Sequence, residues 1–382
     1  MLRKIKTIEK RRQYLEKKTG LSLVDYAFYP PGFSQAEEKN CENMVGAVQV
    51  PIGIAGPLKI IRDNGMSEYY LPLATTEGAL VASVNRGCKA ITRAGGVRVT
   101  SENTGITRGS LFITGGIIES RKLKEWLGKN FTKMQAVAEQ TSGHLRLNGT
   151  FIKYFGTNVY IRFSYDTEDA MGMNMVTFAT EAIIRMVEND TGFKCLAVAA
   201  NFDTDKKPSF LNFLLGRGRE VWAETLLDKQ TVRHILKTTP ELIHEVNLEK
   251  NLKGSMISAS LGFNAHFANI IAAIFLATGQ DIAHVSEGSL GITSTKFVNG
   301  KLLVSIYLPD LPVGTIGGGT YLPSQKASLL LLGSAGGDSG KRAQQFAEII
   351  GGAVLAGEIS LLSAIAAGSL GKAHRLLARG GK

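Results

Sequence analysis

Cysteine is scarce in this sequence, and the few cysteines lie far apart. The 382 residues contain three of them, Cys41, Cys88 and Cys195. An odd number at such wide spacing excludes a disulfide framework and a cysteine-ligated metal cluster. The histidines have no metal-ligand spacing either, so we predict no metal. This cysteine usage fits a reducing compartment, and we expect a cytoplasmic protein.

Long hydrophobic runs are also missing. The longest apolar stretch, around residues 270–277, is far too short to cross a bilayer. A later apolar stretch, residues 349–367, is interrupted by glycines, Glu358 and Ser360, and we interpret it as a buried pair of helices. The charged N-terminus has no apolar core of the signal-peptide type. We therefore predict that the protein has no membrane partner.

The common nucleotide-binding and hydrolase motifs are absent. No G-x-G-x-x-G sequence follows a predicted strand, which argues against an ordinary Rossmann site. Residues 336–342, GGDSGKR, are only a poor match to a phosphate-binding loop, because no Ser or Thr follows Lys341. Neither a G-x-S-x-G elbow nor an H-E-x-x-H motif occurs.

Negative charge is outnumbered: 33 Asp and Glu face 44 Lys and Arg, and the net charge is +11. Much of the excess lies in the first twenty residues. A solvated helical arm is one explanation of this basic segment, and attraction of an anionic partner is the other. No RNA-binding, zinc-finger or basic-zipper pattern follows it, so we predict no nucleic-acid partner and favour a phosphorylated small molecule such as coenzyme A or NADP.

Helical and strand-like segments mix without a regular βαβ alternation, which indicates an α+β fold. After the basic arm, strand-like runs are expected at 45–54, 109–117, 151–163 and 194–201. Helices are expected from residue 75 to 91, over 122–145 and from 169 to 187. The C-terminal half is expected to be mostly helical, with a glycine-rich turn at 314–320.

Several ionisable side chains suit catalysis, although each also has an ordinary structural explanation. Lys206 and Lys207 follow a predicted strand in a turn closed by proline, where a cation either stabilises a developing oxyanion or is simply solvated. Glu77, near a predicted helix start, is a capping-region acid or a proton donor. Asp281 follows an apolar helix, where negative charge is unfavourable, and is a solvated loop residue or a functional one. His374 near the C-terminus lies on the surface or protonates a leaving group.

Two glycine-containing segments are candidate ligand contacts. Residues 169–175, DAMGMNM, are typical of a helix N-terminus, which suits a pyrophosphate, and a methionine-rich core contact is the alternative. The three glycines at 317–319 allow a backbone to touch a ligand, or they form a plain loop.

Taken together and in order, these segments resemble the 3-hydroxy-3-methylglutaryl-CoA (HMG-CoA) reductase family. The match runs from roughly residue 40 to the end, and residues 75–83 resemble the class found in eukaryotes and archaea, without the eukaryotic membrane anchor. The segments that carry the resemblance are CENMVG at 41–46, PIGIAGPL at 51–58, TTEGALVASVNRGC at 75–88, DAMGMNM at 169–175, DKKP at 205–208, NAHFAN at 264–269, GQD at 279–281, the glycine turn at 314–320 and the terminal Ala-His at 373–374.

The resemblance implies an NAD(P)H-dependent, four-electron reduction of HMG-CoA to mevalonate and CoA. Lys206 would stabilise the oxyanion formed after each hydride transfer. Glu77 would protonate the aldehyde oxygen, and Asp281 would couple Glu77 to Lys206. His374 would protonate the departing CoA thiolate. The family's active site forms between subunits, so a homodimer or a higher homo-oligomer is implied.

The resemblance also implies domains and ligand contacts. Beyond the arm at 1–40, a large helical substrate-binding domain would comprise residues 41–113 and 198–382, with an inserted small ferredoxin-like α/β cofactor-binding domain at 114–197. The positions implied for CoA and the acyl group are Ser83, Asn85, Arg86, Lys207, Lys237, Lys250, His266 and Asn269. Those implied for the nicotinamide cofactor are Ser142, Asp169, Met171, Gly172, Met173, Asn174, Gly317, Gly318, Gly319 and Arg379.

Three positions near the expected substrate depart from the family pattern. Ile113 stands where the family has an arginine that grips the acyl carboxylate, Ala199 where it has serine, and His284 where it favours glutamine. Charge-assisted hydrogen bonds contribute roughly 1.5–3 kcal/mol each. Their loss favours, as the alternative function, a paralogue that reduces a different acyl thioester. Lys207 and Lys250 remain as partners for a carboxylate.

The choice between NADPH and NADH rests on one short segment. Ser142 is kept where the family recognises the 2′-phosphate, but Gly143 replaces the usual neighbouring arginine. Arg146 or Arg379 would have to substitute for that arginine. We favour NADPH over NADH.

Overall fold

The computed structural model describes residues 2–63, 65–369 and 371. Its framework is a mixed sheet with the strand order β2-β1-β3-β7-β10-β9-β8. Neighbouring strands are antiparallel, except that β1 is parallel to β3 and β8 to β9. The C-terminal half thus contributes long strands that the sequence pattern did not reveal. The strands are β1 (Ile52–Arg62), β2 (Gly65–Ala74), β3 (Val97–Ile113), β7 (Arg217–Leu227), β8 (Gly262–Phe263), β9 (Gly291–Val298) and β10 (Lys301–Leu311).

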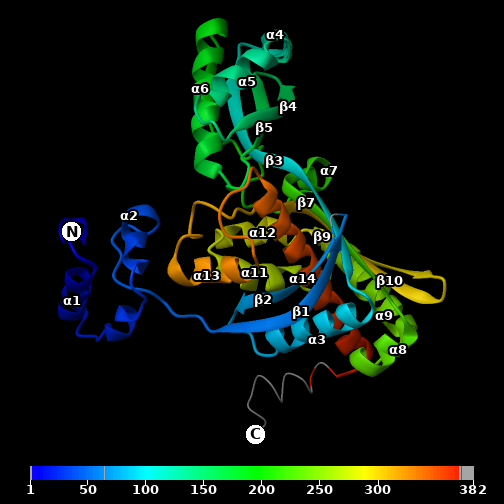
Figure 1. Ribbon diagram of the computed structural model, residues 1–382. Helices are drawn as coiled ribbons and strands as arrows, with labels where there is room; N and C mark the ends of the chain where they lie inside the picture. The colour runs from blue at the N-terminus through cyan, green and yellow to red at the C-terminus, as the bar shows by residue number, and fades with distance from the viewer. Residues whose placement is uncertain (1, 64, 370, 372–382) are drawn as a thin grey trace.

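A second, smaller sheet branches from the end of β3. Beyond Gly105, β3 pairs with β5 and β6 instead of β7, and β5 pairs with β4, all antiparallel. Figure 1 shows this unit at one end of the molecule, covered by helices and joined to the body through β3. It has its own buried apolar cluster, separate from that of the main sheet. Its elements are α4 (Ile117–Lys129), α5 (Phe131–Glu139), β4 (Arg146–Phe155), β5 (Asn158–Asp166), α6 (Met173–Thr191) and β6 (Lys194–Ala197).

Helices pack on the main sheet, and α14 (Lys341–Ala366) is the central one. It contacts β3, β7 and β10 as well as α3 (Leu80–Arg93) and α11 (Phe267–Thr278). By length and hydropathy alone α14 would be able to cross a membrane, but 83% of its most apolar window is buried inside the protein. The remaining helices are α7 (Phe210–Leu215), α8 (Lys229–Thr231), α9 (Pro240–Val246), α10 (Ser255–Ile257), α12 (Val285–Gly288) and α13 (Pro323–Leu331), with π-helical η4 (Val232–Leu236) and η5 (Asn247–Gly254) and 3-10 turns η1 (Leu2–Lys4), η2 (Val24–Ala27), η3 (Phe33–Gln35) and η6 (Ile282–His284).

The basic N-terminal segment is a helical arm with internal anchors. Helices α1 (Ile8–Thr19) and α2 (Ala36–Lys39) lie beside the body, on the side of α13 (Figure 1). Arg11 is only 5% exposed, pairs with Glu37 and donates to the backbone oxygen of Met44 at 3.0 Å. Part of the positive charge of the arm is therefore used to fold the arm.

Several predicted element boundaries were wrong, each for a local reason. Segment 122–145 contains two helices, α4 and α5, which meet at Asn130. Segment 151–163 is a hairpin, because a turn at Gly156, with φ of 55°, separates β4 from β5. Segment 349–367 was predicted as a pair of helices but belongs to one helix. Gly351 and Gly352 do not interrupt α14; they let it lie close against the side chains of the sheet.

The contact between α3 and α14 is unusually close at Gly87. A Cβ atom at this position would lie 1.9 Å from the backbone oxygen of Ala356. On the same face of α3, Arg86 donates to the side-chain and backbone oxygens of Ser360 at 3.0 and 2.6 Å, and the hydroxyl of Ser83 lies 2.9 Å from that of Ser360. Direct helix packing therefore fixes α3 on the core.

The start of α14 is capped from a distant part of the chain. The carboxylate of Asp169 accepts hydrogen bonds from the backbone N–H groups of Asp338, Gly340 and Ala343 at 2.5, 2.8 and 2.9 Å. Burial opposes ionisation of Asp169, but these donors and the nearby Arg219 outweigh it and lower the pKa of this carboxyl group. The donors that a phosphate-binding loop would offer to a ligand are therefore occupied by Asp169.

We expect Gly87→Ala to lower the free energy of unfolding by at least about 1–3 kcal/mol, because the added methyl group has no space between α3 and α14. Gly128→Ala in α4 is the matched control. Nothing lies within 4 Å of its Cβ position, and we expect it to be neutral or stabilising by up to about 1 kcal/mol. Urea unfolding measures both, and equal stabilities would contradict the close contact.

We expect Asp169→Asn to destabilise the protein by about 2–3 kcal/mol at neutral pH, because its amide group would meet backbone donors. Since the folded state lowers the pKa of Asp169, the ionised carboxylate stabilises the fold above the unfolded pKa of about 3.9. That contribution is lost as pH falls through the folded pKa, so the variant and the wild type should converge in acid. Asp338→Asn, whose side chain is 52% exposed, is the control for urea unfolding at both pH values.

Candidate functional site

Lys206 lies in a turn between β6 and α7 that has an unusual backbone. Asn201, Thr204 and Lys206 have φ values of 62°, 59° and 58°. Left-handed backbone costs roughly 1–2 kcal/mol for each residue that is not glycine. The turn therefore depends on contacts from its surroundings.

Two buried arginines supply these contacts. Arg162 of β5 donates to the backbone oxygen of Asp203 at 3.2 Å and to the Thr204 hydroxyl at 2.9 Å. Arg217 of β7, which is 0% exposed, pairs with Asp205 at 2.9 Å. Burial, followed by repulsion from Arg217, lowers the pKa of Arg162 to about 10, so it still carries its charge at neutral pH. A buried charge needs its partners, so the arginines and the turn hold each other in place.

The ammonium group of Lys206 is aimed at Asp281. Its Nζ lies 2.7 Å from Asp281 Oδ2. Helix α11 ends at Gly279, with φ of 74°, and Asp281 then caps η6 by accepting the N–H of Ala283 at 3.1 Å. Negative charge is favourable at this second helix start, which explains an acid that seemed misplaced after α11. Burial opposes ionisation, but Lys206, Ala283 and His284 together lower the pKa of Asp281, so the pair is charged.

We predicted that Glu77 lies at a helix start, but the structure places it in a loop. Helix α3 begins three residues later at Leu80, after Ala79 in the left-handed conformation with φ of 72°. Thr75 does not cap that helix; its hydroxyl accepts the N–H of Glu77 at 2.9 Å. Asn269 of α11 donates to the exposed Glu77 carboxylate at 2.6 Å. The amide thus fixes the direction of the acid.

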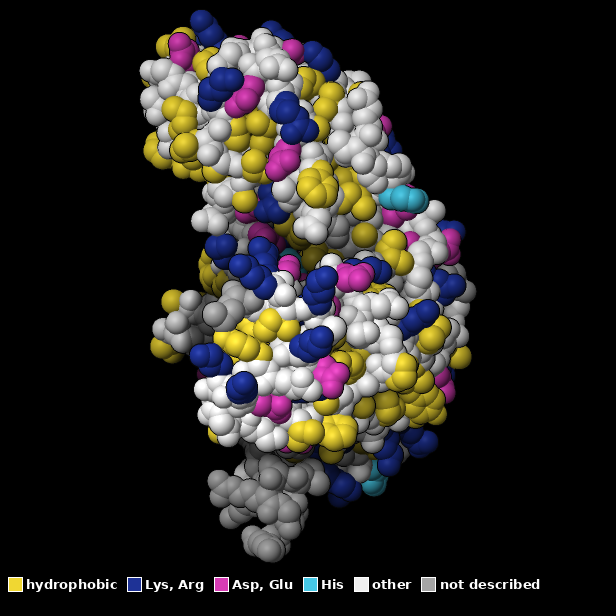
Figure 2. Space-filling model, turned by 90° about the vertical axis from the view of Figure 1, so that its left-hand side faces the viewer, with side chains coloured by type: hydrophobic (Ala, Val, Ile, Leu, Met, Phe, Trp, Pro, Cys, Tyr) yellow, Lys and Arg dark blue, Asp and Glu magenta, His cyan; other side chains and the backbone are white. Residues whose placement is uncertain are grey.

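One cleft brings these predicted residues into the same region. Glu77 and Asn269 line it together with Ile282 and Val285, and Ile282 directly follows Asp281 in the chain. Figure 2 shows the molecule narrowing between the small unit and the body, with basic and acidic side chains gathered at this waist. His374 and Arg379 lie outside the described residues.

The predicted CoA positions gather around α3. Ser83 and Arg86 contact α14 through Ser360, and burial lowers the pKa of Arg86. Asn85 accepts the N–H of Gly56 at 3.0 Å. Lys237 is exposed at the end of η4, which packs on α3.

A buried carboxylate that sequence reasoning missed organises two predicted substrate residues. Glu358 of α14 is 0% exposed and accepts from Thr293 Oγ1 at 2.6 Å, and its Oε1 lies 3.1 Å from Nδ1 of His266. Burial opposes its ionisation, but His266, Thr293 and backbone donors lower the pKa of Glu358. Burial lowers the pKa of Lys250, and Glu358 partly offsets this. Lys207 instead donates to the backbone oxygen of Asp205 at 3.0 Å.

The predicted cofactor segments meet each other and the Asp281 loop. The backbone oxygen of Asp169 accepts the N–H of Thr315 at 2.8 Å, and Ala170 pairs with Ile316, which precedes the glycines at 317–319. Gln280 exchanges two hydrogen bonds of 2.9 Å with Gly314. Gly172 caps α6 with φ of 83°, leaving Met171 and Met173 partly buried and Asn174 exposed.

The groove at Ser142 is mixed in charge. Ser142 lines it with Gly143, His144 and Arg146, and three acids, Glu139, Asp166 and Glu168, lie on the same walls. Nδ1 of His144 lies 2.9 Å from Glu168, and Arg146 faces Glu139 at 4.0 Å. Arg146 is the arginine that this groove offers among the described residues, and it already faces an acid.

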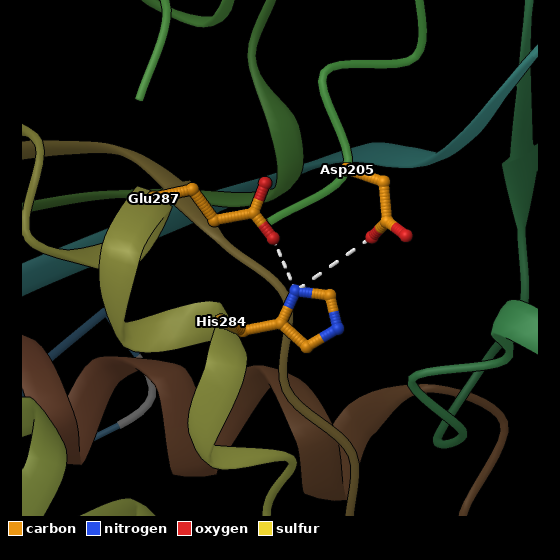
Figure 3. Close-up of side chains that lie close together, drawn as sticks. All are labelled: Asp205, His284 and Glu287. Atoms are coloured by element: carbon orange, nitrogen blue, oxygen red, sulfur yellow. Dashed lines mark hydrogen bonds and ion pairs between the residues drawn. The ribbon is translucent and has the colours of Figure 1, made fainter. Parts of the chain in front are cut away.

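Behind Asp281 and Lys206 lies a buried ionic cluster that the sequence did not indicate. Asp205, His284 and Glu287 point toward one another (Figure 3), with ligand atoms within 4.8 Å. This spacing would suit a metal ion, but Arg217 already forms ion pairs with Asp205 at 2.9 Å and Glu287 at 2.6 Å. A guanidinium thus supplies the positive charge that a metal would supply.

The three residues that depart from the family pattern do not form one pocket wall. His284 is 0% exposed and packed within the ionic cluster. Ile113 ends β3 and pairs with Asn158 of β5 and Lys194 of β6, and Ala199 is exposed at the start of the Lys206 turn. Histidine in place of the family's glutamine at position 284 therefore alters the surroundings of Asp281 and not the lining of the cleft.

Comparisons with known proteins find relatives over nearly the whole chain. Residues 7–379 match the model of the family described as hydroxymethylglutaryl-coenzyme A reductase. A protein of Aeropyrum pernix named 3-hydroxy-3-methylglutaryl-coenzyme A reductase is 50% identical over 375 residues, 97% of this chain and 89% of that protein. One of the same name from Methanocaldococcus jannaschii is 49% identical, over 97% of this chain and 92% of that protein.

A solved structure shows the same fold at much lower identity. It is a class II 3-hydroxy-3-methylglutaryl-CoA reductase from Streptococcus pneumoniae, described as bound to NADPH in open conformations. The TM-score is 0.69 at 20% identity, over 95% of this chain and 98% of that one. Nothing in the comparisons supports a paralogue with another acyl thioester as substrate. From the extent and identity of these matches, the chain belongs to the hydroxymethylglutaryl-coenzyme A reductase family.

Proposed function

We propose that this protein reduces HMG-CoA to mevalonate and CoA with two molecules of a nicotinamide cofactor. The observation that carries the proposal is the Lys206–Asp281 ion pair of 2.7 Å beside the cleft that holds Glu77. The balanced reaction takes up two hydrides and two protons: one thioester becomes one alcohol and one thiol. Family membership and the names of relatives about 50% identical support the same reaction.

Lys206 stabilises the negative charge that develops on the substrate oxygen in each hydride transfer. A preoriented ammonium group is effective here because it needs no reorganisation during the reaction. The left-handed turn and its arginines provide that orientation. Asp281 keeps Lys206 charged and in place.

Glu77 donates a proton to the aldehyde oxygen in the second reduction. Asn269 holds its carboxyl group in position at 2.6 Å. His374 is proposed, from the family resemblance, as the proton donor to the CoA thiolate. The proton needs of both half-reactions are then met by side chains of this chain.

The proposed division into a substrate domain and a cofactor domain follows the two buried apolar clusters. Residues 114–197 form the nicotinamide-binding domain, residues 41–113 and 198–382 the substrate domain, and residues 1–40 the arm. Contacts between segments 169–174 and 314–319 support a cofactor bound across both domains. The side chain of Asp169 shapes this site by capping α14, and the glycines at 317–319 leave the backbone accessible. Ser142 and Arg146 are the proposed contacts of the adenosine end, with NADPH favoured over NADH.

The proposed substrate contacts lie on both sides of the cleft. Ser83, Asn85, Arg86 and Lys237 bind CoA around α3. Lys207, Lys250, His266 and Asn269 bind the acyl group, with Lys250 and Lys207 as cationic partners of its free carboxylate. Burial of Lys250 strengthens such a pairing, because screening by water is weaker there.

A homodimer or larger homo-oligomer is proposed because the site is incomplete in one chain. Burial favours the neutral form of a carboxyl group that must donate a proton, yet Glu77 is exposed. Val48, Ile52 and Ile54, which flank Val50 in the cleft wall, are 79%, 55% and 49% exposed. A second subunit over this face would bury Glu77 and these three apolar side chains. The free cysteines Cys41, Cys88 and Cys195 fit a cytoplasmic location.

The proposal is tested by following NADPH and NADH oxidation with HMG-CoA and product formation. We expect two cofactor molecules oxidised for each mevalonate. Lys206→Met should lower kcat by about 10²–10³-fold, because the oxyanion loses its cation. Lys229→Met, on an exposed lysine paired with Glu241, is the matched control. Wild-type protein that oxidises neither cofactor would overturn the proposal.

We expect Glu77→Gln to lower kcat by about 10²–10⁴-fold, because glutamine keeps the contact with Asn269 but has no proton to donate. The second reduction should suffer most, so an aldehyde-trapping reagent should capture the intermediate from the variant. Glu241→Gln, on a surface acid, is the control. Full activity of Glu77→Gln would assign the proton to another group.

A further inference from the structure

The ring of His284 lies between carboxylates on both of its nitrogens. Nδ1 is hydrogen-bonded to Oε1 of Glu287 and lies 4.0 Å from Asp205 (Figure 3). Nε2 lies 3.8 Å from Oδ2 of Asp281 and has no hydrogen-bond partner among the described residues. His284 and Glu287 are both 0% exposed, so water does not screen these contacts.

This geometry favours the doubly protonated ring. A neutral imidazole carries hydrogen on one nitrogen only, so the lone pair of the other would face a carboxylate. An imidazolium presents N–H groups on both sides, toward Glu287 and toward Asp281. A charged ring therefore matches both carboxylates.

Charged groups from several elements surround the ring. Its own segment contributes Asp281 and Glu287, the Lys206 turn contributes Asp205 and Lys206, and β7 contributes Arg217. Burial, with Glu287 nearby, raises the pKa of Asp310 of β10 well above its usual value. Arg162 of β5 also acts on Glu287, so the charged state of His284 is inferred from its contacts with Glu287 and Asp281 and not from a count of charges.

We propose that His284 is a positioning residue, held as an imidazolium between Glu287 and Asp281, that keeps Asp281 ionised and so keeps Lys206 directed at the reacting carbonyl. The inference rests on the proposed reductase function and adds a residue to its machinery. The charge of His284 is among the causes that lower the pKa of Asp281. His284 touches neither substrate nor cofactor in this scheme and acts through Asp281.

The test is the pH profile of kcat/KM for NADPH-dependent reduction of HMG-CoA by His284→Gln. Without the imidazolium the pKa of Asp281 rises, so Asp281 is protonated earlier as pH falls. We expect the acidic limb to move to higher pH by about one unit, as for loss of an opposite charge at this distance. A purely structural role would instead lower kcat/KM by the same factor at every pH.

Two further variants complete the test. Glu287→Gln removes the anion that holds the ring charged and should move the limb in the same direction. His244→Gln makes the same change at a partly buried histidine that is hydrogen-bonded to Thr295. This variant should leave the acidic limb of the pH profile in place. Folded His284→Gln and Glu287→Gln with unmoved limbs would overturn the inference, as would an equal shift in His244→Gln. Inactive wild-type protein would refute the proposed function itself.

Discussion

The guanidinium group of Arg217 is the point on which the site depends. Without exposure to solvent, it binds Asp205 of the Lys206 turn, Glu287 of α12, Thr107 of β3 and the sulfur of Met173 at the start of α6. One buried cation thus joins the Lys206 turn, α12 after Asp281 and the start of α6. Leaving such a charge without a partner costs several kcal/mol, so these segments are fixed together.

The residues proposed to carry the chemistry were accessible from the sequence because they occur in short, distinctive segments. The structure pairs Lys206 with Asp281 and places Asn269 in the cleft that Ile282, the residue after Asp281, also lines. The start of α3 was misplaced because it depends on the left-handed Ala79, which no local rule favours. Other boundary errors have local causes, such as the turn at Gly156 that divides segment 151–163 into two strands.

The supporting charges could not be found in the sequence. Arg217 and Glu358 lie in a strand and a helix whose patterns give no sign that they are fully buried. Their role arises from pairing with residues far away in the chain. His284 shows the same limit: together with Ile113 and Ala199 it suggested a changed substrate, whereas its buried contacts connect it to Asp281.

The path of β3 has a mechanical consequence. One continuous strand of 17 residues is hydrogen-bonded to β1 and β7 in the body and to β5 and β6 in the small unit. Such a shared strand is not a flexible hinge, because rotation of the small unit would twist a strand that is hydrogen-bonded on both sides of the junction. Any rotation of the small unit relative to the body would therefore meet an elastic restoring force from β3.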